Sequence, residues 1–114
     1  MAGFQNNYRA ILDFLRPQDV TFGNPLTCDC SESVNHIATL SGNTTVNLTS
    51  LTAGMSGVIT LTNNGVGGYT LGFGAAFTSL QNGSDTYDNT AAAVNIIEWS
   101  YDGTDVYYRL INIL

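Results

Sequence analysis

The chain of 114 residues contains no lysine and only three arginines, and with nine acidic residues its formal net charge at pH 7 is −6. A protein that binds nucleic acid or an anionic membrane needs a basic patch on its surface, and this composition does not supply one. We therefore expect no nucleic-acid partner and no membrane insertion. The absence of lysine also excludes a P-loop, because the lysine of that motif reaches the bound phosphates.

Long hydrophobic runs are absent as well. In residues 1–17 the apolar positions are interrupted by Arg9, Asp13 and Arg16, and no basic region precedes them. We therefore expect neither a signal peptide nor a membrane-spanning helix. Charged residues make up only 11% of the chain, whereas Asn, Thr, Ser and Gly are abundant. This composition is typical of short strands joined by polar turns, with part of the surface hidden against neighbouring molecules.

Groups that commonly perform catalysis or bind metals are scarce. Cys28 and Cys30, the only cysteines, are too close for an easy disulfide within one chain and lack the further ligands of a zinc site, so we predict that both are reduced and structural. His36, the only histidine, lies in a predicted strand, where a half-buried side chain is expected more often than a general base. Ser56 does not fit a nucleophile elbow, because Val58 stands where that motif needs glycine. We therefore predict no enzyme, with no catalytic residue, cofactor or metal.

One short segment, residues 6–16, has helical periodicity, and Pro17 ends it. Its apolar positions fall at i, i+3, i+4 and i+7, and they are Tyr8, Ile11, Leu12 and Leu15. A helix of this length is marginal in water, so the stripe must be buried against its own domain, copies of the chain or another protein. We predict that it attaches the protein to a larger assembly.

Residues 17–33 contain both prolines and show no sustained periodicity, which predicts an extended connector. From residue 34 the apolar period falls to two, and strands are predicted at 34–40, 44–48, 58–62, 69–73, 94–101 and 106–113. We therefore divide the chain into an N-terminal attachment segment, 1–33, and a β-sandwich domain, 34–114. On this division, residues 1–30 contribute little to the folding of the β domain.

Several predicted strands are apolar on both faces. Ile97 and Trp99 lie on one side of their strand, and Val94 and Ile96 lie on the other. Two apolar faces imply a second covering layer, which in a chain this small is most economically another subunit. The fold class predicted is therefore all-β, an antiparallel, jelly-roll-like β-sandwich that forms a homotrimer. Trp99 is expected in its core, on the face shared with Ile97 and Tyr101.

The glycine-rich stretch NNGVGGYTLGFG covers residues 63–74. A dinucleotide-binding fingerprint beginning at Gly72 would need glycine where Phe77 stands, and no helical pattern follows it. Asn and Gly accept positive φ angles, so residues 63–68 are predicted to form a hairpin bend. Beyond this bend Gly72 and Gly74 leave one side of the strand nearly bare, which invites close approach of another backbone.

A long loop, residues 75–93, is the candidate binding surface. It carries Phe77 and Tyr87 among polar residues that include Asp85 and Asp88, a mixture that suits stacking on a sugar or closing one end of the sandwich. The aspartates are too sparse for a calcium loop, and turn carboxylates are the favoured interpretation. These four residues are the candidate receptor contacts.

Residues 39–74, TLSGNTTVNLTSLTAGMSGVITLTNNGVGGYTLGFG, and 89–110, NTAAAVNIIEWSYDGTDVYYRL, carry a combined pattern. It resembles the compact β domain of tailed-bacteriophage fibre and virion-decoration proteins. The resemblance implies a homotrimeric β-sandwich or jelly roll that projects from a virion, with the N-terminal segment bound to a capsid or tail protein. The positions that match the motif have structural roles, and they are Gly67, Gly68, Trp99, Asp102 and Gly103.

The function that we expect is that of a non-enzymatic bacteriophage structural protein located in the virion and assembled in the host cytoplasm. A short trimeric head fibre, a capsid decoration protein or a tail-fibre-type protein each suits the length, with the β domain contacting a host-surface glycan. The alternative is a soluble, lectin-like glycan-binding module whose ligand lies on the aromatic side of the long loop. Purified protein on a glycan array would separate the two.

Overall fold

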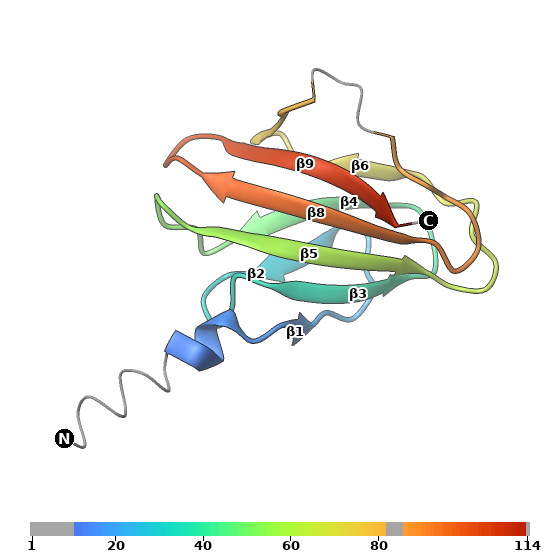
Figure 1. Ribbon diagram of the computed structural model, residues 1–114, viewed down its shortest axis with the longest axis horizontal. Helices are drawn as coiled ribbons and strands as arrows, with labels where there is room; N and C mark the ends of the chain where they lie inside the picture. The colour runs from blue at the N-terminus through green and yellow to red at the C-terminus, as the bar shows by residue number, and fades with distance from the viewer. Residues whose placement is uncertain (1–10, 82–85, 114) are drawn as a thin grey trace.

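The structure, a computed structural model, describes residues 11–81 and 86–113, and their fold is mostly β (Figure 1). Residues 11–15 are helical. The strands that follow are β1 (Gln18–Asp19), β2 (Leu26–Asp29), β3 (His36–Leu40), β4 (Thr44–Thr49), β5 (Ser56–Asn63), β6 (Leu71–Phe73), β7 (Phe77–Ser79), β8 (Val94–Tyr101) and β9 (Val106–Ile113). Strands lie at all six predicted places, and β1, β2 and β7 are additional.

The strands form two sheets, a six-stranded sheet in the order β1-β3-β5-β8-β9-β7 and a three-stranded sheet in the order β2-β4-β6. As far as β6 the chain alternates between the sheets, and each strand pairs in parallel with the strand two places later. This is the connectivity of a short β-solenoid, in which each coil stacks on its neighbour. The β8–β9 hairpin extends the larger sheet antiparallel to β5, and β7 runs parallel to β9.

The predicted antiparallel arrangement is therefore wrong for most of the described pairings, since only β5–β8 and β8–β9 are antiparallel. A jelly roll is built from antiparallel strands, so this connectivity differs from it. Residues 63–68 are not a hairpin bend either, because they lead from β5 in one sheet to β6 in the other. Period-two alternation identifies a strand but not its partner, and a crossover through the opposite sheet leaves no separate mark in the sequence.

The predicted connector contains a core strand. Leu26, Cys28 and Cys30 are fully buried and alternate with exposed Thr27 and Asp29 along and just after β2. The division at residue 33 is therefore not a boundary in packing. Residues 26–30 contribute to the core, although the segment 1–30 was expected to add little to folding of the β domain. The alternation spans only five residues beside a proline, which is too short to establish a period by itself.

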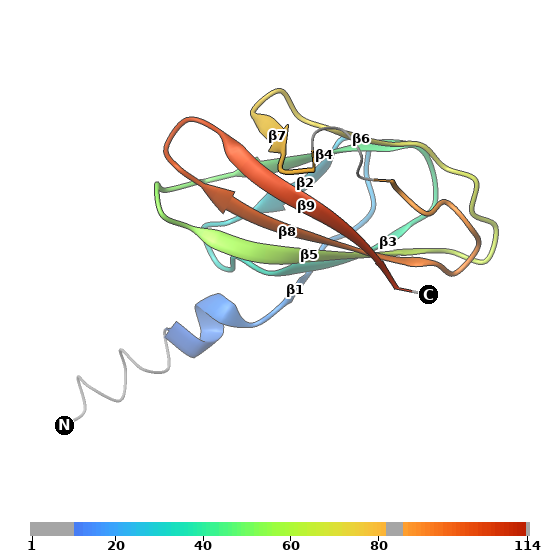
Figure 2. The same cartoon turned by 45° about the horizontal axis from the view of Figure 1, so that its top comes forward.

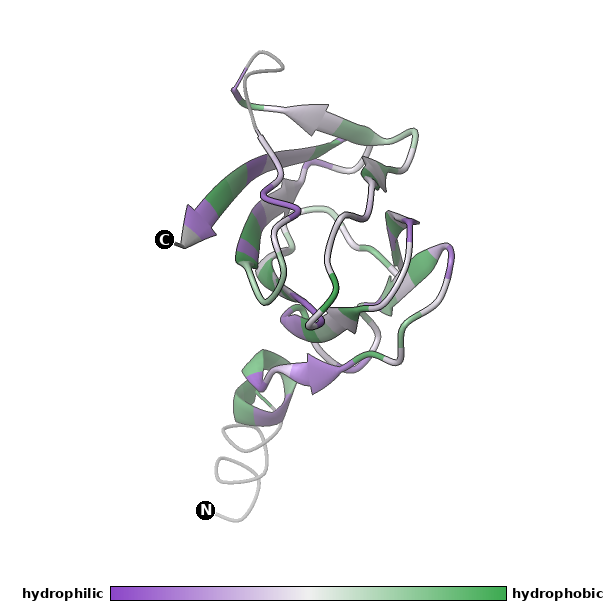
Figure 3. Ribbon diagram, turned by 90° about the vertical axis from the view of Figure 1, so that its right-hand side faces the viewer, coloured by the Kyte–Doolittle hydropathy of each residue, from purple (hydrophilic) through white to green (hydrophobic). Residues whose placement is uncertain are grey.

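Buried side chains from both sheets form one apolar cluster between them. Figure 2 shows the smaller sheet behind β5, β8 and β9, and Figure 3, viewed along the strands, shows the N-terminal helix projecting away from the enclosed core. Trp99 is 3% exposed and lies in this cluster with Ile97, while Tyr101 packs against it. The predicted burial of Trp99 is confirmed.

The bare glycine face is covered by side chains of the neighbouring strand, and not by the other backbone that was predicted to approach it. A Cβ atom placed on Gly74 would lie 2.1 Å from Asn47 Oδ1, and one on Gly72 would lie 3.2 Å from Thr45 Oγ1. Both neighbours belong to β4, which pairs with β6. The glycines therefore leave room for the side chains of Thr45 and Asn47 on this face of the smaller sheet.

His36 is buried, with 1% of its surface exposed, and it should make stability depend on pH. Its Nε2 lies 3.0 Å from the Asp29 carbonyl oxygen and donates to it, whereas Nδ1 has no partner among the described residues. Burial lowers the pKa of His36, although the Asp29 carbonyl and carboxylate oppose this effect. The ring is therefore neutral in the folded protein at neutral pH.

A lowered pKa means that the unfolded chain takes up the proton first as the pH falls. We expect the free energy of unfolding to be constant above about pH 6.5 and to fall below it, by at most about 1.4 kcal/mol per pH unit until the folded pKa is passed. Urea denaturation between pH 7.5 and pH 5 measures this slope. His36→Gln, which keeps a donor but does not titrate, should remove the slope, and a flat wild-type profile would contradict the assignment.

Candidate interaction surfaces

The first surface is the apolar stripe of the N-terminal helix. Ile11, Leu12 and Leu15 are 58%, 47% and 50% exposed, so the β domain does not bury them. Tyr8, the fourth residue of the predicted stripe, lies outside the described residues. Exposed apolar residues grouped on one short helix, rather than scattered singly, are typical of a binding surface.

The helix is nevertheless fixed to the β domain, through residues that the sequence did not single out. Phe14 packs against the core, and its carbonyl accepts a hydrogen bond of 3.2 Å from Val34 N–H. Asn35 Nδ2 donates to the Leu15 carbonyl at 2.7 Å, and Ser33 Oγ donates to the Arg16 carbonyl at 2.6 Å. These bonds satisfy carbonyls that a helix end leaves without partners. The stripe is thereby held away from the domain in a fixed orientation.

The second surface is the outer face of the six-stranded sheet. The strand register aligns Ile37 (β3), Thr60 (β5), Ile96 (β8) and Ile111 (β9) in one row across this sheet. Ile37 is 39% exposed, and the other three are half-buried. At the edge of the sheet the same row continues to exposed Asp19 (β1). The neighbouring rows add Thr39, Val58, Thr62 and Val94, and we call these nine residues the outer face. Figure 1 shows this face toward the viewer, with no described segment in front of it.

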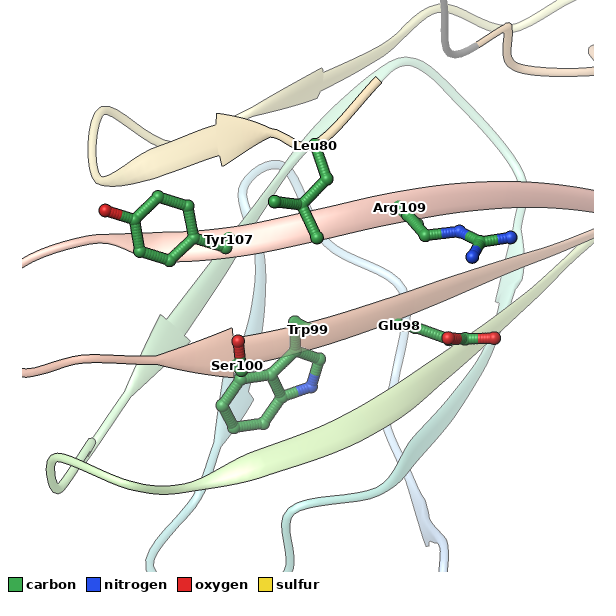
Figure 4. Close-up of a pocket in the computed structure, with 6 residues that line it drawn as sticks. All are labelled: Leu80, Glu98, Trp99, Ser100, Tyr107 and Arg109. Atoms are coloured by element: carbon green, nitrogen blue, oxygen red, sulfur yellow. The ribbon is translucent and has the colours of Figure 1, made fainter. Parts of the chain in front are cut away.

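One end of the outer face carries two opposite charges. Glu98 and Arg109 face each other across β8 and β9, in the row that begins at Val58, and neither forms an ion pair with a described residue. They line a shallow cavity of about 200 Å³ together with Leu80, Trp99, Ser100 and Tyr107 (Figure 4). Small-molecule sites usually measure about 300 to 1,000 Å³, so this cavity is small for a ligand.

The structure disperses the candidate receptor contacts of the long loop. Phe77 lies in β7, where its ring centroid is 5.5 Å from that of Phe73 and 5.7 Å from that of Tyr108. The Tyr87 hydroxyl donates to the Asn63 side chain, and Tyr87 packs against the core. Both rings are therefore used in packing and do not form a stacking platform in solvent. Asp85 lies outside the described residues.

Buried amides hold the segment around Asp88 against the end of the core. Asn63 Nδ2 donates to the carbonyls of Asp88 and Thr90 at 3.0 and 2.9 Å. Asn95 and the Asp88 backbone exchange two hydrogen bonds of 2.9 Å, and Asn112 donates to Asn95 Oδ1. Hydrogen bonds from Thr90 lower the pKa of the Asp88 carboxyl, which is engaged within its own turn. Of the two interpretations of the loop, the structure fits closure of the core.

The glycine pair matched by the family motif lies in a turn that only glycine fits. Gly67 has φ +69° and Gly68 has φ +81°. A Cβ atom on Gly67 would lie 2.6 Å from Ala91 N, closer than real Cβ atoms approach. Asn64 Oδ1 organises the turn by accepting from Val66 N–H, Gly67 N–H and the Tyr69 hydroxyl.

The other matched pair forms the β8–β9 turn. Gly103 has φ +104°, and Asp102 Oδ1 accepts from the N–H groups of Thr104 and Asp105 at 2.8 and 2.7 Å. These bonds lower the pKa of Asp102, since they stabilise the carboxylate. The carboxylates of Asp102 and Asp105 in turn raise the pKa of nearby Tyr107. Their arrangement is that of a turn, with the carboxylate occupied by backbone donors.

The two cysteines are free, fully buried and adjacent on one side of the strand. Burial raises the pKa of Cys28 to about 12 and that of Cys30 to about 11. Both thiols therefore stay protonated at neutral pH and act as small apolar side chains. Among residues 11–81 and 86–113, no group of three His, Cys, Asp or Glu side chains is placed to hold a metal ion.

The described part of the chain contains no helix long and apolar enough to cross a membrane. The candidate surfaces described above are identified from the structure of this chain alone. Comparisons of the chain with models of protein families, with curated proteins and with solved structures find no match.

Proposed function

We propose that the protein is a non-enzymatic structural protein of a bacteriophage virion. It is a short trimeric head fibre, a capsid decoration protein or a tail-fibre-type protein, attached by its N-terminal segment and projecting the two sheets as a β-sandwich. The observation that carries this proposal is the exposed stripe of Ile11, Leu12 and Leu15 on a helix whose end is fixed to the β domain.

This arrangement suits attachment because it separates two tasks. Phe14 and the capping bonds connect the helix to the β domain, while the stripe remains available to a partner. An amphipathic helix of this kind docks its apolar side into a groove of the partner. Because the helix end is already held, less conformational freedom is lost on binding than for a free peptide.

The chemistry of the side chains supports a structural role rather than an enzymatic one. The two thiols are buried with raised pKa values, and His36 is buried with a lowered pKa and one nitrogen bonded to a carbonyl. A nucleophile or general base must reach a substrate, which these groups do not do.

Trimer formation is supported by the aliphatic residues of the outer face, which would stay partly exposed to water in a monomer, namely Ile37, Val58, Val94, Ile96 and Ile111. The glycan-binding alternative requires exposed aromatic rings. It is disfavoured here, because Phe77 and Tyr87 pack inward.

The test is incorporation of the protein into virus particles. The double variant Ile11→Asp/Leu15→Asp should reduce its binding to particles assembled without it by about a hundredfold or more, because burying each apolar side chain contributes roughly 1.5 to 3 kcal/mol. Binding is measured by co-sedimentation, and electron microscopy of labelled particles locates the protein.

Val66→Asp is the matched control, since Val66 is equally apolar and 77% exposed on a distant turn. Its circular dichroism and its binding should equal those of the wild type. Normal incorporation of a folded double variant would refute attachment through the stripe, and absence of the wild-type protein from particles would refute the virion role.

A further inference from the structure

A polar hollow of about 160 Å³ lies where the end of the N-terminal helix meets the β domain. The residues that line it are Asp13, Arg16, Pro17, Gln18, Glu32 and Ser33. Arg16 N–H donates to the Asp13 carbonyl at 3.2 Å, which keeps the last turn of the helix wound. Arg16 also follows Leu12 by four residues, and residues so spaced are neighbours on one side of a helix. The hollow therefore begins beside the apolar stripe, and a protein that covers Leu12 also reaches it.

The charges in the hollow differ in how they are engaged. Arg16 Nη2 lies 3.1 Å from Asp13 Oδ1, so these two groups form an ion pair. Among the described residues Glu32 accepts one hydrogen bond, from Gln18 Nε2 at 3.5 Å, which is longer than an ordinary N–H···O bond. Two carboxylates and one guanidinium leave the hollow with a net charge of −1. This charge belongs to Glu32, because Arg16 already neutralises Asp13.

We infer that the hollow receives a basic side chain, lysine or arginine, from the protein that binds the stripe. The inference rests on the proposed function, and it names the chemistry of the attachment partner, an apolar groove with a base at its border. A carboxylate accepts charge-assisted hydrogen bonds from an ammonium or guanidinium group. One cation would neutralise the hollow, whereas an acidic side chain would be repelled by Glu32.

The charge of the whole chain favours the same kind of partner. With a net charge of −6, the chain repels an acidic surface and attracts a basic one. An acidic partner would also find no free base among the described residues of the hollow, since Arg16 is engaged by Asp13. Charges at the border of an interface mainly set specificity and association rate. The stripe therefore supplies most of the affinity, and the hollow selects the partner.

Two neutral substitutions with opposite expected effects test the inference. Glu32→Gln brings the hollow to zero charge, so binding to particles assembled without the protein should weaken by about two- to fivefold. Arg16→Gln brings the hollow to −2, so binding should tighten by up to about fivefold. Both side chains are exposed, and the bond from Ser33 to Arg16 uses a backbone carbonyl that is unchanged, so neither variant should lose its fold.

Glu98→Gln is the matched control, because it removes the same charge from an exposed residue of β8, which lies away from the helix (Figure 1). It should bind particles as the wild type does. Binding constants come from co-sedimentation at low salt. They are measured again at about 1 M NaCl, where the Debye length is only about 3 Å, and the differences between the proteins should disappear.

Weaker binding of Glu32→Gln together with tighter binding of Arg16→Gln, while Glu98→Gln is unchanged, supports the inference. The opposite signs would show that the hollow receives an acid, and equal binding of all four proteins would show that it lies outside the contact. Equal weakening by Glu32→Gln and Glu98→Gln would assign the effect to overall charge. Each of these three results overturns the inference and leaves the virion role intact, because the wild type still binds. A wild-type protein that never joins particles refutes the virion role and the inference with it.

Discussion

Trp99→Ala should lower the free energy of unfolding by about 3 to 5 kcal/mol, because it removes a large side chain that is 3% exposed. Small domains have about 5 to 15 kcal/mol of stability in total, so the variant should be largely unfolded at 37 °C. The indole lies directly beneath β5, where a Cβ atom placed on Gly57 would be 3.1 Å from Trp99 Cζ2. Neighbouring groups cannot fill the space that its loss leaves without moving a strand.

Trp99→Phe is the control, and it should cost much less than Trp99→Ala. The indole N–H of Trp99 is buried without a partner among the described residues, so replacing it with a phenyl ring removes an unsatisfied donor while keeping most of the apolar volume. Urea denaturation followed by circular dichroism compares the three proteins. If Trp99→Ala lowers the free energy of unfolding by less than about 1 kcal/mol, the ring is not packed as described.

The strands could be predicted because each has its own signal, but their partners could not. The sequence of β8 predicted a strand that is apolar on both faces. In the structure Ile97 and Trp99 lie in the core, whereas Val94 and Ile96 lie on the uncovered face of the sheet. That the chain crosses between sheets after almost every strand depends on loop paths that do not change the period of two. Parallel pairing was therefore not predictable from alternation.

The helix illustrates the same limit for the candidate site. The spacing of Ile11, Leu12 and Leu15 predicted an apolar stripe, and the structure exposes it. Phe14 lies off this stripe, yet it is the residue that packs on the core. Periodicity shows which residues share a face of a helix, but not which face its own domain uses.

Polar residues were the least predictable part of the core. Asn63 and Asn95 are almost fully buried, and their amides bind the backbone near Asp88. Asparagine is a standard turn residue, so its presence in the sequence favoured a turn or loop. Only the three-dimensional arrangement shows that a carbonyl lies within reach, since a buried amide is tolerated when its hydrogen bonds are made.

Deletion of residues 1–30 should abolish folding of the β domain. The truncated chain lacks β2 and with it Leu26, Cys28 and Cys30, which are fully buried in the core. Burial of a side chain as large as leucine contributes about 1.5 to 3 kcal/mol. The three buried side chains together therefore contribute several kcal/mol, which is comparable with the whole stability of a small domain. The loss also exposes the edge of β4, where Val46 pairs with Leu26.

Deletion of residues 1–10 should leave the domain folded, since it keeps every described core residue and every described bond to the helix end. Point variants within β2 refine the comparison. Leu26→Ala should cost about 2 to 5 kcal/mol in urea denaturation, whereas Thr27→Ala, in the same strand but exposed, should cost about 0.5 kcal/mol or less. A β-rich, cooperatively unfolding protein that lacks residues 1–30 would instead show that β2 is dispensable and that the core closes without it.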